Sequence, residues 1–314
     1  MGRYSPSLGP FPGHFPPRRI GPILPAAGRK HSMAVIAIVA QGAMGAGIGR
    51  RLTGQGATVL TSLAGRSAAS ARRAAEAGMQ DAAPEALAAA DIVLSVLPPA
   101  EARACAAWMA PALRAAARKA VYVDCNAISP ATAAEVAGLI APTGADFVDG
   151  GIIGGPPRED GYTPVLYVAG EAAERLAPLR AHGLDVRVTP GPVGAASALK
   201  MSYAGITKGL TALGAAMLLA ASRGGAAEGL GAELARSQPE LLGFFRRMVP
   251  PMYDKAYRWV GEMEEIADFT GPEAAAIYQA IARFYEEMAA DQAGPRQRTA
   301  ALSAFLDAAP KEQG

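Results

Sequence analysis

Short apolar runs alternate with Ala-rich stretches from Met33 to about Thr189, and this alternation restricts the possible fold more than any other feature. The strand-like runs lie at 34–39, 58–61, 91–97, 120–125 and 146–149. The Ala-, Arg- and Glu-rich segments between them predict crossover helices. Strands that alternate with helices in this way predict an α/β protein with a doubly wound parallel sheet. Two later runs, 164–170 and 185–191, flank one more helix and extend the sheet.

The pattern becomes helical after Gly194. Residues 196–223 predict one long helix that ends at Gly224-Gly225. Further helices are predicted at 226–236, 239–247, 252–268, 272–291 and 296–308. We therefore expect a Rossmann-type nucleotide-binding domain at 33–195 and an all-α substrate and dimerisation domain at 196–314.

Residues 1–32 are rich in Pro and Gly and show no periodicity, which predicts a disordered tail. Met33 directly precedes the first strand, so we expect translation to begin there and the tail to be a gene-model extension. The tail holds five basic residues and no acid; without it 25 basic and 28 acidic residues remain. The expected folded part therefore has no basic surplus for a nucleic acid.

Composition gives a second set of expectations. The apolar stretches 33–49 and 209–221 are too short, or too broken by glycine, to span a bilayer. Cys105 and Cys125 have neither metal-ligand spacing nor a disulfide framework. We expect a cytoplasmic protein that binds no metal, nucleic acid or membrane.

The segment AQGAMG, residues 40–45, lies between a predicted strand and a predicted helix. Gly42 would let the backbone approach a pyrophosphate, and Gly45 would allow close packing of the helix on the strand. The N–H groups of the helix start, at Ala43 and Met44, would face the phosphates. Ala40 replaces the usual first glycine, a change that a residue of negative φ tolerates. The loop is predicted to hold a dinucleotide.

The second strand indicates which dinucleotide is bound. NAD sites usually place an acid at its end, but no acid occurs from Thr53 to Ala75. The polar residues there are Thr61, Ser62, Arg66 and Ser67. They suit a 2′-phosphate, so NADP(H) is favoured over NAD(H). The alternative is that Arg66, Arg72 and Arg73 form an ordinary solvated helix face.

Lysines, rather than histidines, are the candidates for proton transfer. His14 and His31 lie in the tail, and His182 lies near the end of a helix. Only six lysines occur, and Lys200 and Lys208 fall within the apolar long helix. Burial among apolar side chains lowers the pKa of a lysine toward the range of an acid–base catalyst. The alternative is that both amines reach solvent while their stems cover apolar neighbours.

Five motifs resemble the β-hydroxyacid dehydrogenase and 6-phosphogluconate dehydrogenase superfamily, in the order that the superfamily has them. They are AQGAMG (40–45), LSVLPP (94–99), DCNAISP (124–130), DGGIIGG (149–155) and GPVGAASALK (191–200). The helical part resembles a branch with a variant C-terminal domain of uncharacterised function.

The resemblance implies a Rossmann-type domain, an all-α second domain and a homodimer formed through the helical domain. It implies that Lys200 is the general acid/base of a small-molecule oxidoreductase. The expected cofactor contacts on the nicotinamide side are Leu97, Pro98 and Asn126. Gly154, Gly155, Asn126 and Tyr203 are expected to bind substrate, with the glycine N–H groups available to a carboxylate.

Three departures from the superfamily pattern make the expected pocket more apolar. Ile153 replaces the substrate-binding serine, Asn126-Ala127 replaces a Ser-Thr pair, and Tyr203-Ala204 occupies the position of an asparagine. The lysine itself is retained, whereas imine-reducing relatives generally lack it, which favours alcohol and carbonyl chemistry.

The sequence therefore predicts an NADP(H)-dependent enzyme that interconverts a secondary alcohol and a carbonyl. The substrate is expected to resemble a 3-hydroxy acid with an apolar or aromatic substituent. One alternative is an inactive NADP(H) sensor. Another is an S-adenosylmethionine-dependent methyltransferase, which the helical lysine motif disfavours.

Overall fold

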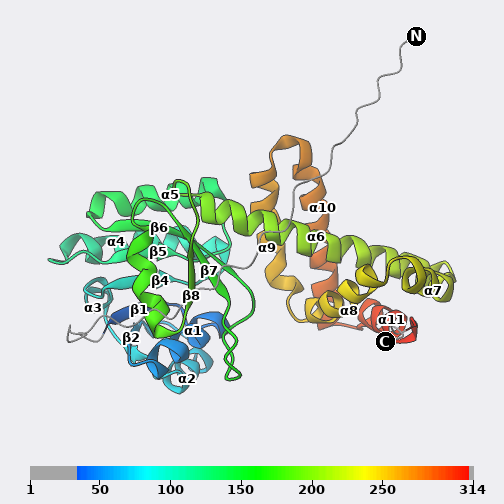
Figure 1. Cartoon of the computed structure of the whole chain (residues 1–314), viewed down its shortest axis with the longest axis horizontal. Helices are drawn as coiled ribbons and strands as arrows, with labels where there is room; N and C mark the ends of the chain where they lie inside the picture. The colour runs from blue at the N-terminus through cyan, green and yellow to red at the C-terminus, as the bar shows by residue number, and fades with distance from the viewer. Residues whose placement is uncertain (1–33, 311–314) are drawn as a thin grey trace, which may run out of the picture. The chain divides into compact units, whose positions relative to one another are not determined.

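The computed structural model describes residues 34–310, and the predictions for residues 1–32 and for the start at Met33 lie outside this range. Eight strands form one sheet, ordered β3-β2-β1-β4-β5-β6-β7-β8 (Figure 1). The strands are β1 (Val35–Val39), β2 (Thr58–Thr61), β3 (Gln80–Asp81), β4 (Ile92–Ser95), β5 (Val121–Asp124), β6 (Asp146–Ile153), β7 (Val165–Ala169) and β8 (Asp185–Val188). Every neighbouring pair is parallel except β6 and β7. The predicted Rossmann-type α/β fold with a mainly parallel sheet is thus confirmed. Strand β7 runs antiparallel to β6, because a loop rather than a crossover helix joins the two.

The helices around the sheet bury both of its faces. They are α1 (Ala43–Gly54), α2 (Ala68–Glu76), α3 (Pro84–Ala88), η1 (Pro99–Glu101), α4 (Ala102–Ala115), α5 (Pro130–Ile140), η2 (Ala141–Thr143) and η3 (Ala173–His182). One apolar cluster includes Ile36, Ile38 and Leu52, and the other includes Ala37, Val93 and Tyr122. Because alternate residues of a strand point to opposite faces, consecutive residues of β1 contribute to different cores.

The part of the chain after β8 is helical, as predicted. It consists of α6 (Ala195–Arg223), α7 (Ala227–Ser237), α8 (Pro239–Tyr253), α9 (Ala256–Thr270), α10 (Pro272–Ala293) and α11 (Gln297–Ala308). A third core, which includes Met201, Leu218 and Tyr285, holds these helices together. Helix α8 runs through Pro250-Pro251, beyond its predicted end, because buried Val249 and Met252 anchor its last turn in that core.

Residues 209–221, the apolar stretch that the sequence pattern marks here, are too short by themselves to span a bilayer. The complete helix α6 is longer, with 29 residues, and is apolar over most of its length. Within residues 34–310 it alone has the length and composition to cross a membrane, with a mean hydropathy of 1.4 over its best window. Half of that window is buried inside the chain. The apolar residues of α6 therefore divide between the helical core and an exposed face that includes Ile206, Leu213 and Met217.

Candidate functional site

The glycine loop has the geometry that an anionic group requires. Gly42 is the N-cap of α1, no side chain caps this end, and no acid lies in the first turn. A Cβ atom on Gly42 would meet nothing within 4 Å, whereas one on Gly45 would lie 1.9 Å from the Ala40 carbonyl oxygen. The first helical hydrogen bond is donated by the Ala46 N–H to the Gly42 carbonyl, so the amides of Ala43, Met44 and Gly45 have no helical acceptor. The residues therefore fit a pyrophosphate.

The predicted polar residues beyond β2 include two serines that are bonded within the protein and an arginine whose side chain is exposed. The Ser67 hydroxyl caps α2 by accepting from the Ser70 N–H, and Ser62 is buried with its carbonyl accepting from Gln41. Both predicted serines thus have structural roles. Arg66 is exposed, and among the described residues its guanidinium has no hydrogen bond or ion pair, while its backbone N–H donates to the Leu63 carbonyl.

Arg73 binds the glycine loop, although the sequence pattern predicts it only as part of a solvated helix face. Its Nε donates to the Gln41 carbonyl at 2.9 Å, and one terminal nitrogen donates to the Ser70 hydroxyl at 3.1 Å. Asp81 was also missed, because it lies on β3: its carboxylate accepts from the Leu63 N–H at 2.8 Å. Strand pairing between β2 and β3 brings this acid beside the end of β2.

The start of α6 is fixed by one buried carboxylate. Asp149, at 1% exposure, accepts the N–H groups of Gly194, Ala196 and Ser197 at 2.9–3.0 Å and the Ser197 hydroxyl at 2.6 Å. A negative charge at a helix N-terminus also interacts favourably with the helix dipole. This carboxylate therefore joins β6 directly to the helix that carries Lys200.

Lys200 lies against the same strand. Its Nζ donates to the Ile152 carbonyl at 2.7 Å, and the residue is half-buried. The approach is close because position 151 is glycine: a Cβ there would lie 2.9 Å from the Ala196 carbonyl oxygen and 3.0 Å from the Lys200 Cβ. The glycine segment thus seats the helix and positions the lysine amine at the end of β6.

The Asn126 side chain is held by bonds within the protein, and its contacts with cofactor and substrate stay predictions. Its Nδ2 donates to the Ser95 hydroxyl and to Asp124, and its Oδ1 accepts from the Leu97 N–H at 2.5 Å. The side chain is 2% exposed and ties the ends of β4 and β5 together. Leu97 and Pro98 follow β4 at this edge of the sheet.

Burial, helped by the charges of Asp149 and Glu265, raises the pKa of Asp124 to about 7, although the hydrogen bonds from Asn126 act to lower it. Glu265, on α9, accepts from the Ser129 N–H at 2.7 Å and the Thr132 hydroxyl at 2.9 Å. A carboxylate of α9 thus reaches the start of α5. The loop after β5 is therefore fixed by Asp124, which binds Asn126, and by Glu265, which binds Ser129.

The Gly155 N–H is not free for a substrate carboxylate, in contrast to the expectation. It donates to the Tyr162 hydroxyl at 3.0 Å. Gly154 has φ +126°, and a Cβ there would lie 2.3 Å from the same hydroxyl oxygen. Arg51 of α1 donates to the carbonyls of Arg158 and Tyr162 and fastens the loop. The loop between β6 and β7 therefore folds back over the glycines.

Lys208 is the lysine at which the expected effect of burial occurs. Its ammonium is paired with Glu262 of α9, and both side chains are largely buried, at 13% and 15% exposure. Burial lowers the pKa of Lys208 to about 8 against the attraction of Glu262. This pairing could not be predicted from the sequence, since nothing in it shows that α9 packs on α6.

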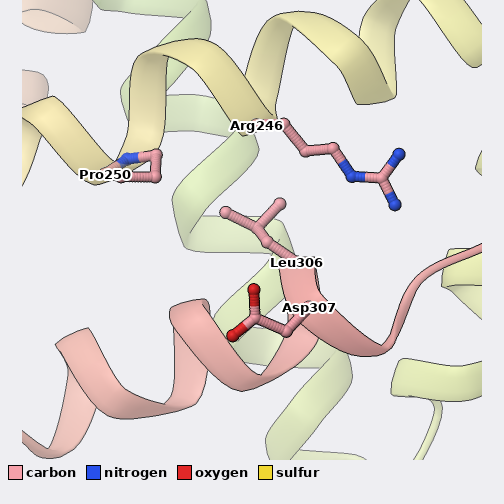
Figure 2. A pocket seen from close by; sticks show the side chains of 4 residues that line it. All are labelled: Arg246, Pro250, Leu306 and Asp307. Atoms are coloured by element: carbon pink, nitrogen blue, oxygen red, sulfur yellow. The ribbon is translucent and has the colours of Figure 1, made fainter. Parts of the chain in front are cut away.

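Arg246, on α8, is held by carbonyl groups of the chain itself. Figure 2 shows a pocket between α8 and α11 that is lined by Arg246, Pro250, Leu306 and Asp307. Arg246 donates to the carbonyls of Ala309 and Pro310. Arg246 therefore binds the backbone at the end of α11.

Comparison with known proteins identifies the class. Residues 35–183 match the NAD-binding domain of 6-phosphogluconate dehydrogenase, and residues 221–288 match a domain of unknown function, DUF1932. No curated protein matches the chain. Residues 35–183 are therefore similar to this family of NAD-binding domains.

Solved structures agree with this architecture. A conserved hypothetical protein from Sinorhizobium meliloti 1021 is 28% identical, with a TM-score of 0.62, over 88% of this chain and 98% of that one. A conserved protein of unknown function, described as structurally similar to 3-hydroxyacid dehydrogenases, is 26% identical, with a TM-score of 0.64, over 85% and 99%. The 3-hydroxyisobutyrate dehydrogenase of Mycobacterium tuberculosis with L-serine, 21% identical over 87% and 99% with a TM-score of 0.61, shares the fold.

The Asp149 cap gives a first prediction. Asp149→Ala leaves three buried N–H groups without an acceptor and is expected to lower the free energy of unfolding by about 3 kcal/mol. Ser197→Ala removes only the hydroxyl bond and is expected to cost about 1 kcal/mol. Urea denaturation followed by circular dichroism measures both. Equal losses in the two variants would show that the carboxylate is not the main support of α6.

Proposed function

We propose that this protein is an NADP(H)-dependent oxidoreductase that interconverts a secondary alcohol and a carbonyl, with Lys200 as the general acid/base. The observation that carries the proposal is the position of the Lys200 amine, hydrogen-bonded to the Ile152 carbonyl. Strands β1, β4, β5 and β6 are parallel, so their carboxyl ends share one edge of the sheet. The glycine loop follows β1 at that edge, where ligands of such sheets bind.

The chemistry divides between cofactor and chain. A nicotinamide bound at the glycine loop would supply or accept the hydride of the reaction. In reduction the Lys200 ammonium gives its proton to the oxygen as the C–O double bond becomes single; in oxidation the neutral amine takes that proton. The Ile152 carbonyl accepts one N–H of the amine and leaves the others for the substrate oxygen.

The pocket residues support a substrate with an apolar or aromatic substituent, of the 3-hydroxy-acid type. Ile153 follows the carbonyl that holds Lys200, and Tyr203 lies about one helical turn from the lysine with half of its surface exposed. An exposed aromatic ring beside an amine offers a contact for an aromatic or aliphatic group. With the Gly155 N–H used by Tyr162, a substrate acid group requires other donors.

The preference for NADP(H) is supported by two arginines beyond β2. Arg66 is exposed, and Arg73 is held at the glycine loop by the Gln41 carbonyl. A guanidinium can bind a 2′-phosphate through paired, charge-assisted hydrogen bonds. The one acid near β2, Asp81, is engaged by the Leu63 N–H.

We propose in addition that two copies associate through one face of α6. The exposed face consists of Tyr203, Ile206, Leu210, Leu213 and Met217. These residues alternate at spacings of three and four, which is the a/d seam of a helix pair, over about 21 Å. No charged side chain interrupts this face, and a second copy supplies the same apolar seam in a two-fold arrangement. The seam begins one turn from Lys200, so the partner would lie beside the site.

Replacement of Lys200 tests the reaction. Lys200→Met keeps the aliphatic stem, so we expect NADPH oxidation with a panel of 3-oxo acids, aldehydes and aryl ketones to fall at least about 100-fold, with NADPH affinity unchanged. Lys255→Met, at an exposed lysine, is the control. Full activity of Lys200→Met would refute the lysine's role. NADPH binding by the wild type without turnover of any panel member would favour the sensor alternative.

Cofactor choice is tested at the two arginines. Arg66→Ala and Arg73→Ala are each expected to weaken NADPH binding about 10-fold, the loss of one charge-assisted contact, and to leave NADH binding unchanged. Arg72→Ala, whose guanidinium is exposed and 4.0 Å from Glu76, is the matched control. Fluorescence titration measures both cofactors. Equal weakening of NADH and NADPH would mean that the arginines support the loop alone.

The association is tested by a charge in the seam. Wild-type protein at micromolar concentration is expected to sediment as a dimer and Leu213→Glu as a monomer, because a buried unpaired carboxylate disrupts an apolar interface. Leu139→Glu, on exposed surface of α5, should leave the dimer intact. A monomeric wild type would rule out this face as a self-association surface.

A further inference from the structure

The loop that joins β6 to β7 is fastened to itself and to α1 at several points. The Arg158 N–H donates to the Tyr162 carbonyl at 2.9 Å, which closes a turn. Arg51 of α1 donates to the carbonyls of Arg158 and Tyr162 at 3.0 and 3.1 Å. Pro157 packs on α1 at Gly47, where a Cβ would lie 3.0 Å from the proline ring. The loop therefore has a fixed position beside the carboxyl end of β6.

The Tyr162 side chain is held in this loop by its ring and by its hydroxyl. The Arg158 guanidinium lies 4.7 Å from the centre of the ring, in cation–π geometry, and pairs with Asp160 at 3.1 Å. The hydroxyl oxygen accepts the Gly155 N–H at 3.0 Å. It lies over Gly154, where a Cβ would overlap it. Because Gly154 has no side chain, the phenol reaches the glycine segment.

The proton of the Tyr162 hydroxyl remains available to a ligand. A tyrosine hydroxyl both donates and accepts hydrogen bonds, and the Gly155 N–H occupies only an acceptor position. Among the hydrogen bonds of residues 34–310 this hydroxyl donates to no group. Tyr162 is 38% exposed, so a ligand can approach it. An oxygen that accepts a hydrogen bond becomes a stronger donor, so Tyr162 offers a polarised O–H at the glycine segment.

This hydroxyl and the proposed acid–base group are held by the same short stretch of chain. The Lys200 amine donates to the Ile152 carbonyl at 2.7 Å, near the end of β6. Gly154, which lies against the Tyr162 hydroxyl, is two residues further on, and two residues of chain span at most about 7 Å. The separation suits a small acid that contacts the amine through its hydroxyl or carbonyl oxygen and the phenol through its carboxylate.

We propose that Tyr162 is a substrate-binding residue that selects an acid group: its hydroxyl donates to the substrate carboxylate while the Gly155 N–H holds the hydroxyl oxygen in place. A hydrogen bond from a hydroxyl to a carboxylate is short and about twice as strong as one between neutral groups. Arg158 and Asp160 balance each other's charge, so the hydrogen bond rather than a net positive charge recognises the acid. The place of this contact in a reaction rests on the proposed function; the contact itself does not.

A different interpretation of the same hydrogen bond makes the opposite prediction. If the hydroxyl only blocked the Gly155 N–H until a substrate displaced it, its removal would free that N–H, and an acid would bind more tightly. The bonds from Arg51 and within the turn favour a tyrosine that stays in place. A purely structural role of Tyr162 would instead affect acidic and neutral ligands equally.

The test measures binding without the need for turnover. Isothermal titration calorimetry of the full chain, in the presence of NADP+, compares 3-hydroxy-3-phenylpropanoate with its neutral methyl ester. Tyr162→Phe removes the hydroxyl and keeps the ring that Arg158 covers. Tyr257→Phe, at an exposed tyrosine of α9, is the matched control. Circular dichroism confirms that each variant is folded.

We expect the wild type to bind the acid more tightly than the ester, and Tyr162→Phe to weaken binding of the acid about 10-fold, the loss of one charge-assisted hydrogen bond. Binding of the ester should be unchanged, and Tyr257→Phe should bind both ligands as the wild type does. In turnover of an acidic substrate, Tyr162→Phe should raise KM and leave kcat nearly unchanged, because the contact is made equally in the ground state and the transition state.

Tighter binding of the acid by Tyr162→Phe, equal weakening of acid and ester, or a wild type that does not prefer the acid would each overturn the proposal. Acid binding that depends on Tyr162, in a protein that turns over no carbonyl substrate, would retain this site and reject the proposed function. Turnover that is lost in Lys200→Met, together with acid binding unchanged in Tyr162→Phe, would do the reverse.

Discussion

The carboxylate of Asp149 is the contact on which the arrangement of the site depends. It joins the sheet to the helical half of the chain, because it lies on β6 and accepts four hydrogen bonds at the start of α6. A rigid 29-residue helix begins there. Its direction is therefore fixed at one end, and every side chain along it is placed relative to the edge of the sheet. Lys200 reaches the Ile152 carbonyl for this reason.

The glycine segment that follows Asp149 acts by its lack of side chains more than by its N–H groups. Gly151 lets α6 lie directly on β6, and Gly154 leaves room for the Tyr162 hydroxyl. A motif that the resemblance assigns to substrate is thus used first for packing. The same holds for Asn126, whose side-chain amide forms hydrogen bonds that join the end of β4 to the end of β5.

Much of this fold could be predicted from local pattern, because strands buried on both faces appear as short apolar runs and long helices appear as Ala-rich helical patterns. Seven of the eight strands lie where short apolar runs occur; the exception, Gln80–Asp81, is too short and polar to leave such a record. The antiparallel β7 could not be predicted, since strand direction depends on pairing. Arg73 and Glu262 could not be placed either, because each acquires its role from an element distant in sequence.

The sequence by itself determined the α/β order of elements, the glycine loop and the presence of a lysine in an apolar helix, because these depend on neighbours along the chain. Only the tertiary structure decided which polar groups remain free. Hydrogen bonds between distant segments use the Gly155 N–H and the Asn126 amide, and helix packing brings Glu262 to Lys208. A polar group's availability depends on what lies within about 3 Å of it, and that is set by the folding of the whole chain.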